Sequence, residues 1–112
     1  MFCFFPDVEI LKAVQSGNLD ILKLLLEARE DKNPVISIKP DGEEGSVLIT
    51  AAAFGHLNII VYYKDILQFT DINPKSNYGF TPLFYASLQG HLDVVDYYEK
   101  NGYKASSKIY IF

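Results

Sequence analysis

One stretch of the chain occurs three times, and each copy is centred on a glycine. The copies are AVQSGNLDILKLLLE, AAAFGHLNIIVYYKD and ASLQGHLDVVDYYEK, built around Gly17, Gly55 and Gly90. The glycines are 38 and 35 residues apart, and a second marker recurs as DKNP at 31–34 and DINP at 71–74. Such a period is typical of proteins in which small units stack, because one unit alone cannot bury its hydrophobic face. The repetition therefore predicts a stack of three similar units.

Local signals predict that each unit is a helix, a tight turn and a second helix. In the third unit the hydroxyl of Thr81 can cap the first helix, and Pro82 suits the first helical position, where no N–H is needed. We expect Gly90 to end this helix in a left-handed conformation, which costs glycine little. The second helix is expected to run from Leu92 to about Lys100. The predicted fold class is therefore all-α.

Residues 79–102, GFTPLFYASLQGHLDVVDYYEKNG, closely resemble the consensus of the ankyrin repeat. The matching residues are Gly79, Thr81, Pro82, Leu83, Ala86, Gly90, His91, Val94, Val95 and Gly102. The second unit matches at Leu48, Ala51, Ala52, Gly55, His56, Ile59 and Ile60, and the first at Ala13, Gly17, Leu19, Leu24 and Leu25. The resemblance covers about residues 7–103. It implies an ankyrin-repeat solenoid of stacked helix-turn-helix pairs with short β-hairpin or loop fingers.

The three units occupy most of the chain, which we expect to form a single ankyrin-repeat domain over residues 1–112. The repeats are placed at about 7–33, 42–73 and 77–103, followed by a tail at 104–112. The chain departs from the family pattern at Ile49 and Phe84, where histidine is usual. It also departs at Tyr62-Tyr63 and Tyr97-Tyr98, where the family has paired leucines.

Charge and composition exclude several classes of ligand. The formal net charge is −4 and the isoelectric point is near 5.0, so the basic face needed to bind nucleic acid is not expected. No apolar stretch approaches the roughly 20 residues of a membrane-spanning helix. The single cysteine, Cys3, excludes an internal disulfide and fits a reducing compartment. We therefore expect a cytoplasmic protein that binds neither nucleic acid nor membrane.

Candidate residues for catalysis or metal binding are few. His56 and His91 occupy the same place in successive repeats, whereas a zinc site needs three or four ligands with local spacing. We expect both histidines to cap or brace the turn between the helices of their repeat. Cys3 has no sequence neighbour that would activate its thiol, and the carboxylates are scattered over predicted solvent faces. The sequence predicts no catalytic residue, no cofactor and no metal.

The resemblance implies a non-catalytic protein–protein interaction module. In this family, partners are usually held on a concave face by the finger tips and by the exposed end of helix one. The corresponding residues are Gln15, Ser16, Glu43, Ala53, Phe54, Asn77, Tyr78, Phe80, Leu88 and Gln89. Phe54, Tyr78, Phe80 and Leu88 are apolar or aromatic, and aromatic side chains dominate the binding energy of many interfaces. Packing on a neighbouring finger, or simple single exposure, would explain the same residues without a partner.

The C-terminal end of the array leaves two alternatives open. After Gly102 the sequence YKASSKIYIF does not resemble a polar capping repeat, although repeat stacks need protected ends. We expect the far side of Val94, Val95, Tyr97 and Tyr98 to be uncovered there, unless the tail folds back over it. Such a face would suit a spacer segment of a longer solenoid with no partner of its own. It would also suit self-association of the chain.

Overall fold

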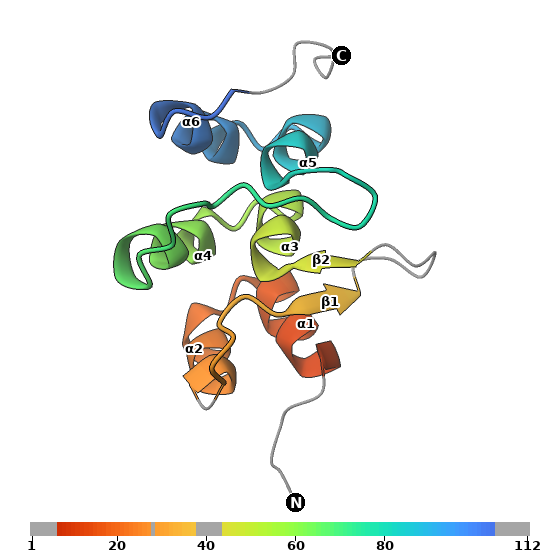
Figure 1. Cartoon of the computed structure of the whole chain (residues 1–112), viewed down its shortest axis with the longest axis vertical. Helices are drawn as coiled ribbons and strands as arrows, with labels where there is room; N and C mark the ends of the chain where they lie inside the picture. Colours follow the sequence, from red (N-terminus) through yellow and green to blue (C-terminus); the bar gives the residue numbers. More distant parts are fainter. Residues whose placement is uncertain (1–6, 28, 38–43, 105–112) are drawn as a thin grey trace, which may run out of the picture.

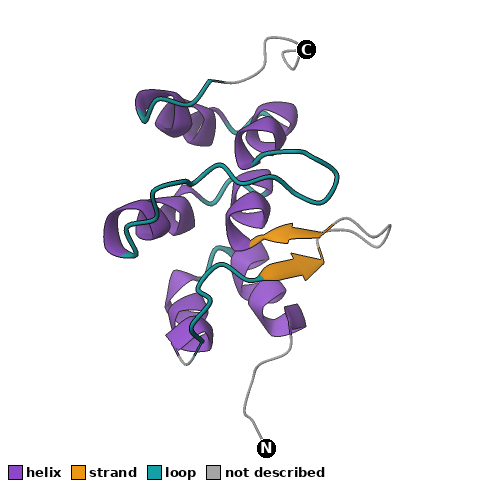
Figure 2. Ribbon diagram, viewed as in Figure 1, coloured by secondary structure: helices purple, strands orange, loops and turns teal. Residues whose placement is uncertain are grey.

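The computed structural model describes residues 7–27, 29–37 and 44–104 of the chain. Within these ranges the chain forms three helix pairs and one short hairpin (Figures 1 and 2). The elements are α1 (Asp7–Ser16), α2 (Leu19–Glu27), β1 (Val35–Ser37), β2 (Glu44–Ser46), α3 (Val47–Ala53), α4 (Leu57–Val61), η1 (Tyr62–Ile66), α5 (Pro82–Gln89) and α6 (Leu92–Lys100). The prediction of an all-α stack of helix pairs with short fingers is confirmed.

The first helices of the three pairs lie in one column and the second helices in another (Figure 1). α3 contacts both α1 and α5, so the second repeat lies in the middle of the stack. Every residue of α3 from Val47 to Ala52 is buried. The alanines Ala51 and Ala52 present almost no side chain, which allows the neighbouring helices to approach closely. The middle repeat is the most apolar of the three because it is covered on both sides.

The predicted signals of the third repeat are confirmed at both ends of α5. The backbone N–H of Phe84 donates a hydrogen bond of 3.1 Å to the hydroxyl of Thr81, and Pro82 is the first helical residue. Gly90 ends the helix with a φ of 79°, in the left-handed region that favours glycine. In the second repeat Ser46 stands where Thr81 stands in the third, but its hydroxyl makes no capping bond. That hydroxyl is buried without a hydrogen-bond partner among the described residues.

The Asp-x-Asn-Pro segments join each second helix to the next first helix. Asp71 Oδ1 accepts a hydrogen bond of 2.9 Å from the backbone N–H of Asn73, which closes a tight turn. The side-chain oxygen of Asn73 then accepts from the backbone N–H of Leu83 at 3.1 Å, in the first turn of α5. The same two bonds occur one repeat earlier, through Asp31, Asn33 and Leu48, at 3.0 and 3.4 Å. Each Asp-x-Asn-Pro segment therefore holds the first turn of the helix that follows it, α3 or α5.

Two tyrosines that replace family leucines reach these same segments. Tyr63 and Tyr98 are fully buried. The hydroxyl of Tyr98 donates to the backbone carbonyl of Ile72 at 2.5 Å, and that of Tyr63 donates to the carbonyl of Lys32. Burial raises the pKa of both phenols well above its usual value, because the charged form would lose its hydration. Each phenol fastens a second helix to the preceding connector, a contact that leucine could not make.

The second helix of the middle repeat changes its winding after α4. It continues as the π-helix η1, in which the backbone N–H of Leu67 donates to the carbonyl of Tyr62, five residues earlier, at 3.1 Å. The ring of Phe69 then packs edge-on against Tyr63, with the ring centres 5.1 Å apart. The periodicity of the sequence did not predict this change, because α6 in the corresponding place is a regular α-helix.

The expected bare side of α6 was assigned to the wrong residues. Val94, Val95 and Tyr98 are buried, with exposed fractions of 0%, 8% and 0%, and Tyr97 is half-buried. These side chains point into the stack, where they pack with residues of the core. Among the described residues at this end, Leu88 at the end of α5 and Leu92 at the start of α6 are the large apolar residues that stay exposed.

Candidate functional site

The two histidines join consecutive repeats. His56 Nε2 lies 2.6 Å from the carbonyl oxygen of Gln15, and His91 Nε2 lies 3.0 Å from that of Ala53. A carbonyl oxygen can only accept, so Nε2 carries the proton in both bonds. The expectation that each histidine braces the turn of its own repeat is therefore corrected, since both reach into the preceding repeat. Among the residues that the structure describes, no cluster of three or more His, Cys, Asp or Glu could hold a metal ion.

The turn glycines make room for these histidines. A Cβ on Gly17 would come within 2.7 Å of His56 Nδ1, and a Cβ on Gly55 within 2.6 Å of His91 Nδ1. Both distances are far below an ordinary contact between heavy atoms. Glycine at these places therefore serves two needs, a left-handed backbone and the close approach of an imidazole ring. Only the first of these needs could be recognised from the sequence.

The predicted partner residues at the ends of the first helices lie at the surface, although several also serve the fold. Gln15 and Ala53 are partly buried, and their carbonyls accept the histidine bonds. Ser16 is exposed, and its hydroxyl donates to the carbonyl of Ala13 at 3.1 Å. Gln89 is exposed, and Leu88 and Phe54 are exposed by 42% and 45%. The ring of Phe54 stacks on that of His56, with the ring centres 6.5 Å apart.

The predicted finger residues of the third repeat lie in a turn at 76–80 that is held by Ser76. Its buried hydroxyl accepts from the backbone N–H groups of Tyr78 and Phe80, at 3.2 and 3.3 Å. The backbone N–H of Ser76 donates to the carbonyl of Phe80 at 2.8 Å, and that of Gly79 donates to the carbonyl of Ser76 at 2.9 Å. Asn77, Tyr78 and Phe80 are all exposed. The turn thus presents these side chains from a backbone closed by four hydrogen bonds.

Phe80 belongs to a cluster of three aromatic rings that we call the finger cluster, made of Phe80, Phe84 and Tyr85. Phe80 stacks on Phe84 with ring centres 4.5 Å apart and an interplanar angle of 10°. Tyr85 meets both rings edge-on, at 5.9 Å from Phe80 and 5.5 Å from Phe84. Phe80 remains 38% exposed. The sequence singled out Phe80 alone, and the spacing of four residues between Phe80 and Phe84 was the signal that could have linked them.

The predicted residues fall into separate groups. The finger turn at 76–80 precedes α5, whereas Leu88 and Gln89 end that helix of eight residues, about 12 Å further along its axis. In the second repeat, β1 and β2 form an antiparallel hairpin in which Val35 pairs with Ser46 and Ser37 with Glu44. The predicted finger residue Glu43 lies outside the described residues.

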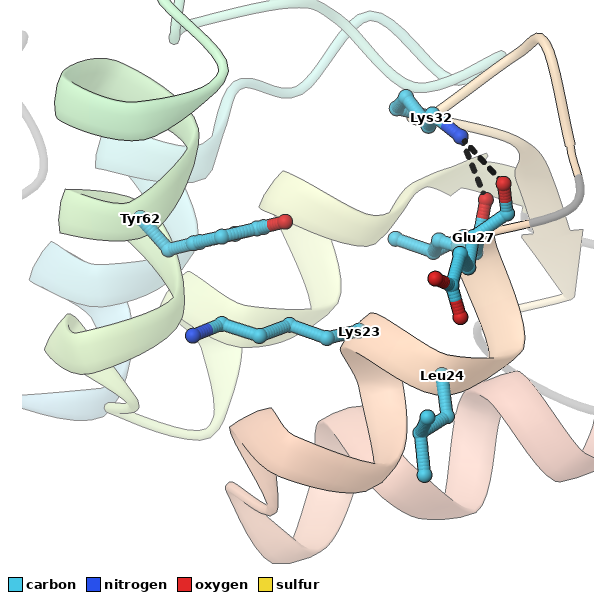
Figure 3. Close-up of a pocket in the computed structure, with 6 residues that line it drawn as sticks. Lys23, Leu24, Glu27, Lys32 and Tyr62 are labelled. Carbon is cyan, nitrogen blue, oxygen red and sulfur yellow. Dashed lines mark hydrogen bonds between the residues drawn. The ribbon is translucent and has the colours of Figure 1, made fainter.

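A pocket of about 330 Å³ lies on the other side of the stack, between α2 and the start of η1 (Figure 3). It is lined by Lys23, Leu24, Leu26, Glu27, Lys32 and Tyr62. Lys32 Nζ donates to the carbonyls of Leu26 and Glu27, at 2.7 and 3.2 Å, and so caps the end of α2. Lys23 Nζ lies 5.0 Å from the ring centre of Tyr62, a cation–π contact. The amine of Lys23 therefore contacts the second repeat, whereas that of Lys32 holds the end of α2 in the first.

No helix in the described part of the chain is long and apolar enough to cross a membrane.

Comparison with known proteins found a match to a family model of ankyrin repeats, in three copies, over residues 10–108. A protein of Rickettsia bellii (strain RML369-C) named as an ankyrin repeat protein is 33% identical over 78 residues, which cover 70% of this chain and 12% of the relative. Alpha-latrotoxin-Lh1a of Latrodectus hasselti is 43% identical over 56 residues, which cover 50% of this chain and 4% of the toxin.

The chain thus spans a small fraction of the length of both relatives. Repeats of this family are in general protein–protein interaction modules, and they are typically non-catalytic. The family match covers most of the chain and agrees with the three stacked helix pairs, the turn glycines and the connecting segments described above. This protein belongs to the ankyrin-repeat family.

Proposed function

We propose that this chain binds another protein through the finger turn at 76–80 and the exposed ends of its first helices. The residues proposed to contact the partner are Gln15, Ser16, Glu43, Ala53, Phe54, Asn77, Tyr78, Phe80, Leu88 and Gln89. The observation that carries this proposal is the finger cluster, because it keeps the ring of Phe80 partly in water and fixes its orientation. The role is non-catalytic and needs no cofactor or metal.

The structure of the finger turn suits binding for two physical reasons. A partner that covers Phe80 and Tyr78 would remove large aromatic surfaces from water, and such residues supply much of the energy of interfaces. The turn is already closed by the hydrogen bonds of Ser76, so little conformational entropy would be lost on binding. The overall charge of −4 favours a partner with a basic or neutral surface over nucleic acid.

We also propose that the protein is cytoplasmic. Photo-crosslinking in the cytoplasm of the source organism therefore tests whether a partner binds at the finger turn. A benzoylphenylalanine replaces Phe80 in one variant and Asp96, on the exposed side of α6, in a control variant. We expect a defined crosslinked protein from the position of Phe80 and not from that of Asp96. The purified partner should then bind the Phe84→Ala variant at least about tenfold more weakly, because Phe84 orients the ring of Phe80. Equal crosslinking from both positions would contradict the proposal.

A second candidate function concerns the C-terminal end of the stack. The exposed fraction of Leu92 is 76%, the largest among the exposed large apolar side chains of the described residues. This exposure supports a role as a segment of a longer solenoid, or self-association through this end. Sedimentation of the purified chain at increasing concentration separates the two, since self-association alone would raise the mass of the particle.

A further inference from the structure

The pocket between α2 and η1 lies where the first repeat packs on the second, and the same place one repeat later is built differently. Lys32 and Ile72 are the second residues of the two Asp-x-Asn-Pro segments, and the carbonyl of each accepts from a buried tyrosine. The side chain of Ile72 is fully buried in the core, whereas that of Lys32 is partly buried and lines the pocket. An amine therefore takes the place of a core residue at this pocket.

The second helix of the middle repeat also differs from that of the third. After α6 the backbone N–H of Tyr103 donates to the carbonyl of Tyr98, five residues earlier, at 3.1 Å. In the middle repeat the corresponding bond runs from Phe69 to Tyr63, six residues earlier, at 3.0 Å. The rings of both pairs meet edge-on, which confirms that the two places correspond. The middle repeat thus contains one residue more, and the π-helix η1 takes it up.

This extra residue is accompanied by a strained backbone. Gln68 has a φ of 58° and is the only residue other than glycine with a positive φ in the described part of the chain. The corresponding residue of the third repeat is Gly102, with a φ of 93°. Strained residues and π-helices both cost stability, and both occur preferentially at functional sites. Tyr62, the first residue of η1, lines the pocket, so this irregular segment begins at its wall.

The polar groups of the pocket have hydrogen-bonding capacity to spare. Lys23 and Glu27 are four residues apart on α2, a spacing that favours an ion pair, but no ion pair joins these two described residues. The amine of Lys23 lies against the ring of Tyr62 instead. The amine of Lys32 uses two of its three N–H groups for carbonyls at the end of α2. The pocket therefore offers donors that no described residue occupies.

The arrangement of these groups favours an anion with an apolar part. The hydroxyl of Tyr62 points from η1 toward the end of α2, where Lys32 lies, and it makes no hydrogen bond to a described residue (Figure 3). Two ammonium groups line the pocket against one carboxylate, that of Glu27, which is exposed to solvent. Leu24 and Leu26 add apolar surface. The volume of about 330 Å³ is at the lower end of the range for small-ligand sites.

We propose that this pocket binds a small carboxylate with an apolar body, either a free acid or the C-terminal residue of a polypeptide. The carboxylate would accept hydrogen bonds from the hydroxyl of Tyr62 and from the remaining N–H of Lys32, and the ammonium group of Lys23 would balance its charge. The apolar body would cover Leu24 and Leu26. Such a ligand uses the spare donors and the apolar surface of the pocket together.

Titration of the full chain with three probes of one shape tests the charge of the ligand. The probes are isocaproate, its neutral amide and the cationic isohexylamine, and the readout is the shift of the ring resonances of Tyr62 and the amide resonance of Lys23. Isocaproate should give saturable shifts, and the amide should bind at least about tenfold more weakly, because it lacks the charge that strengthens each hydrogen bond. An amide or an amine that binds as tightly as isocaproate would overturn the proposal.

The Tyr62→Phe variant tests the hydroxyl while it keeps the aromatic wall. It should bind isocaproate at least about fivefold more weakly than the unmodified chain. Tyr97→Phe is the matched control, because Tyr97 occupies the same place in the third repeat and does not line the pocket. Equal affinities of the two variants would overturn the assignment of the hydroxyl as a donor to the ligand.

Two lysine substitutions test the charge of the walls. Lys23→Gln should weaken binding at least about threefold, whereas Lys12→Gln, an equal change of charge at an exposed place on α1, should not. Lys32→Ile gives the first connecting segment the sequence of the second and should abolish the titration. Urea denaturation shows whether this last variant is folded. Should it unfold, the comparison of Lys23→Gln with Lys12→Gln still decides, and equal binding by these two would overturn the proposal.

A peptide distinguishes the two sources of the carboxylate. N-acetyl-glycyl-leucine and its C-terminal amide are titrated in the same way as isocaproate. Tighter binding of the peptide acid than of isocaproate would identify a polypeptide end as the ligand, and weaker binding would identify a free acid. The absence of saturable shifts with both acids would overturn the proposal. Binding through Phe80 would be untouched by that result, because the finger turn precedes α5 and the pocket is formed by α2 and η1.

Discussion

The imidazole of His91 lies so close to Gly55 that a Cβ on this glycine would come within 2.6 Å of the ring atom Nδ1. On its other side the ring donates from Nε2 to the carbonyl of Ala53, 38 residues earlier in the chain. The contact depends on the absence of a side chain at the turn. The packing of the third repeat on the second at this point therefore requires a residue without a Cβ at position 55.

The first prediction compares two glycines of nearly identical backbone conformation. Gly55 and Gly90 have φ values of 78° and 79°, so alanine suffers similar backbone strain at either place. At Gly55 the added methyl group also displaces the ring of His91, and overfilling such a contact costs about 1–3 kcal/mol. Gly55→Ala should therefore lower the free energy of unfolding, measured in urea, by that much more than Gly90→Ala. Equal losses of stability in the two variants would contradict a tight contact between Gly55 and His91.

The second prediction concerns the buried hydroxyl of Tyr98. Tyr98→Phe removes the donor to the carbonyl of Ile72, and we expect a loss of about 1–3 kcal/mol in the free energy of unfolding, since a buried acceptor loses its partner. Tyr97→Phe is the matched control, because Tyr97 lies beside Tyr98 but is only half-buried. Chemical denaturation of the three proteins gives the comparison. A Tyr98→Phe variant as stable as Tyr97→Phe would show that the bond contributes nothing.

The third prediction is a loss of stability at alkaline pH. Burial raises the pKa of Tyr63 and Tyr98 above the usual value of about 10, so above that pH the unfolded chain releases phenol protons that the folded chain retains. Below about pH 10 both states keep these protons, so the free energy of unfolding does not change with pH through these groups. Above it, that free energy should fall, by up to about 1.4 kcal/mol per pH unit for each tyrosine.

Denaturation in urea at several alkaline pH values measures this slope. The double variant Tyr63→Phe and Tyr98→Phe should show a flatter decline, because it lacks the two retained protons. Absorbance of phenolate should rise in two steps in the unmodified chain, the later one coinciding with unfolding. An unchanged slope in the double variant would refute the assignment of these protons.

The fourth prediction compares the caps of two first helices. Thr81→Ala should destabilise the chain by about 1 kcal/mol, because the backbone N–H of Phe84 loses its acceptor. Ser46→Ala, at the equivalent place before α3, should cost less than about 0.5 kcal/mol, since the hydroxyl of Ser46 makes no capping bond. It also removes a buried hydroxyl that has no partner among the described residues. Thermal unfolding of both variants checks the difference, and a larger loss for Ser46→Ala would contradict it.

The sequence by itself determined the features that depend on a few neighbouring residues. Thr81 caps α5 because its hydroxyl lies three residues from the N–H that it accepts, and Gly90 ends α5 because only glycine adopts this φ at little cost. Repetition of these local signals at a nearly constant period identified the family and the stack. It also located the finger turn that holds Phe80, because the turn is adjacent to the same cap.

Only the tertiary structure decided which surfaces meet between repeats. His56 and Gln15 are separated by 41 residues, and Tyr98 and Ile72 by 26, so no local pattern could pair them. The exposure of apolar side chains gives a second example. Leu92 and Val94 are two residues apart and of similar hydrophobicity, yet Val94 is fully buried and Leu92 is 76% exposed. The direction in which each side chain leaves α6 relative to the stack makes that difference. Burial depends on how the helices pack against each other, so it cannot be predicted from the hydrophobicity of each residue alone.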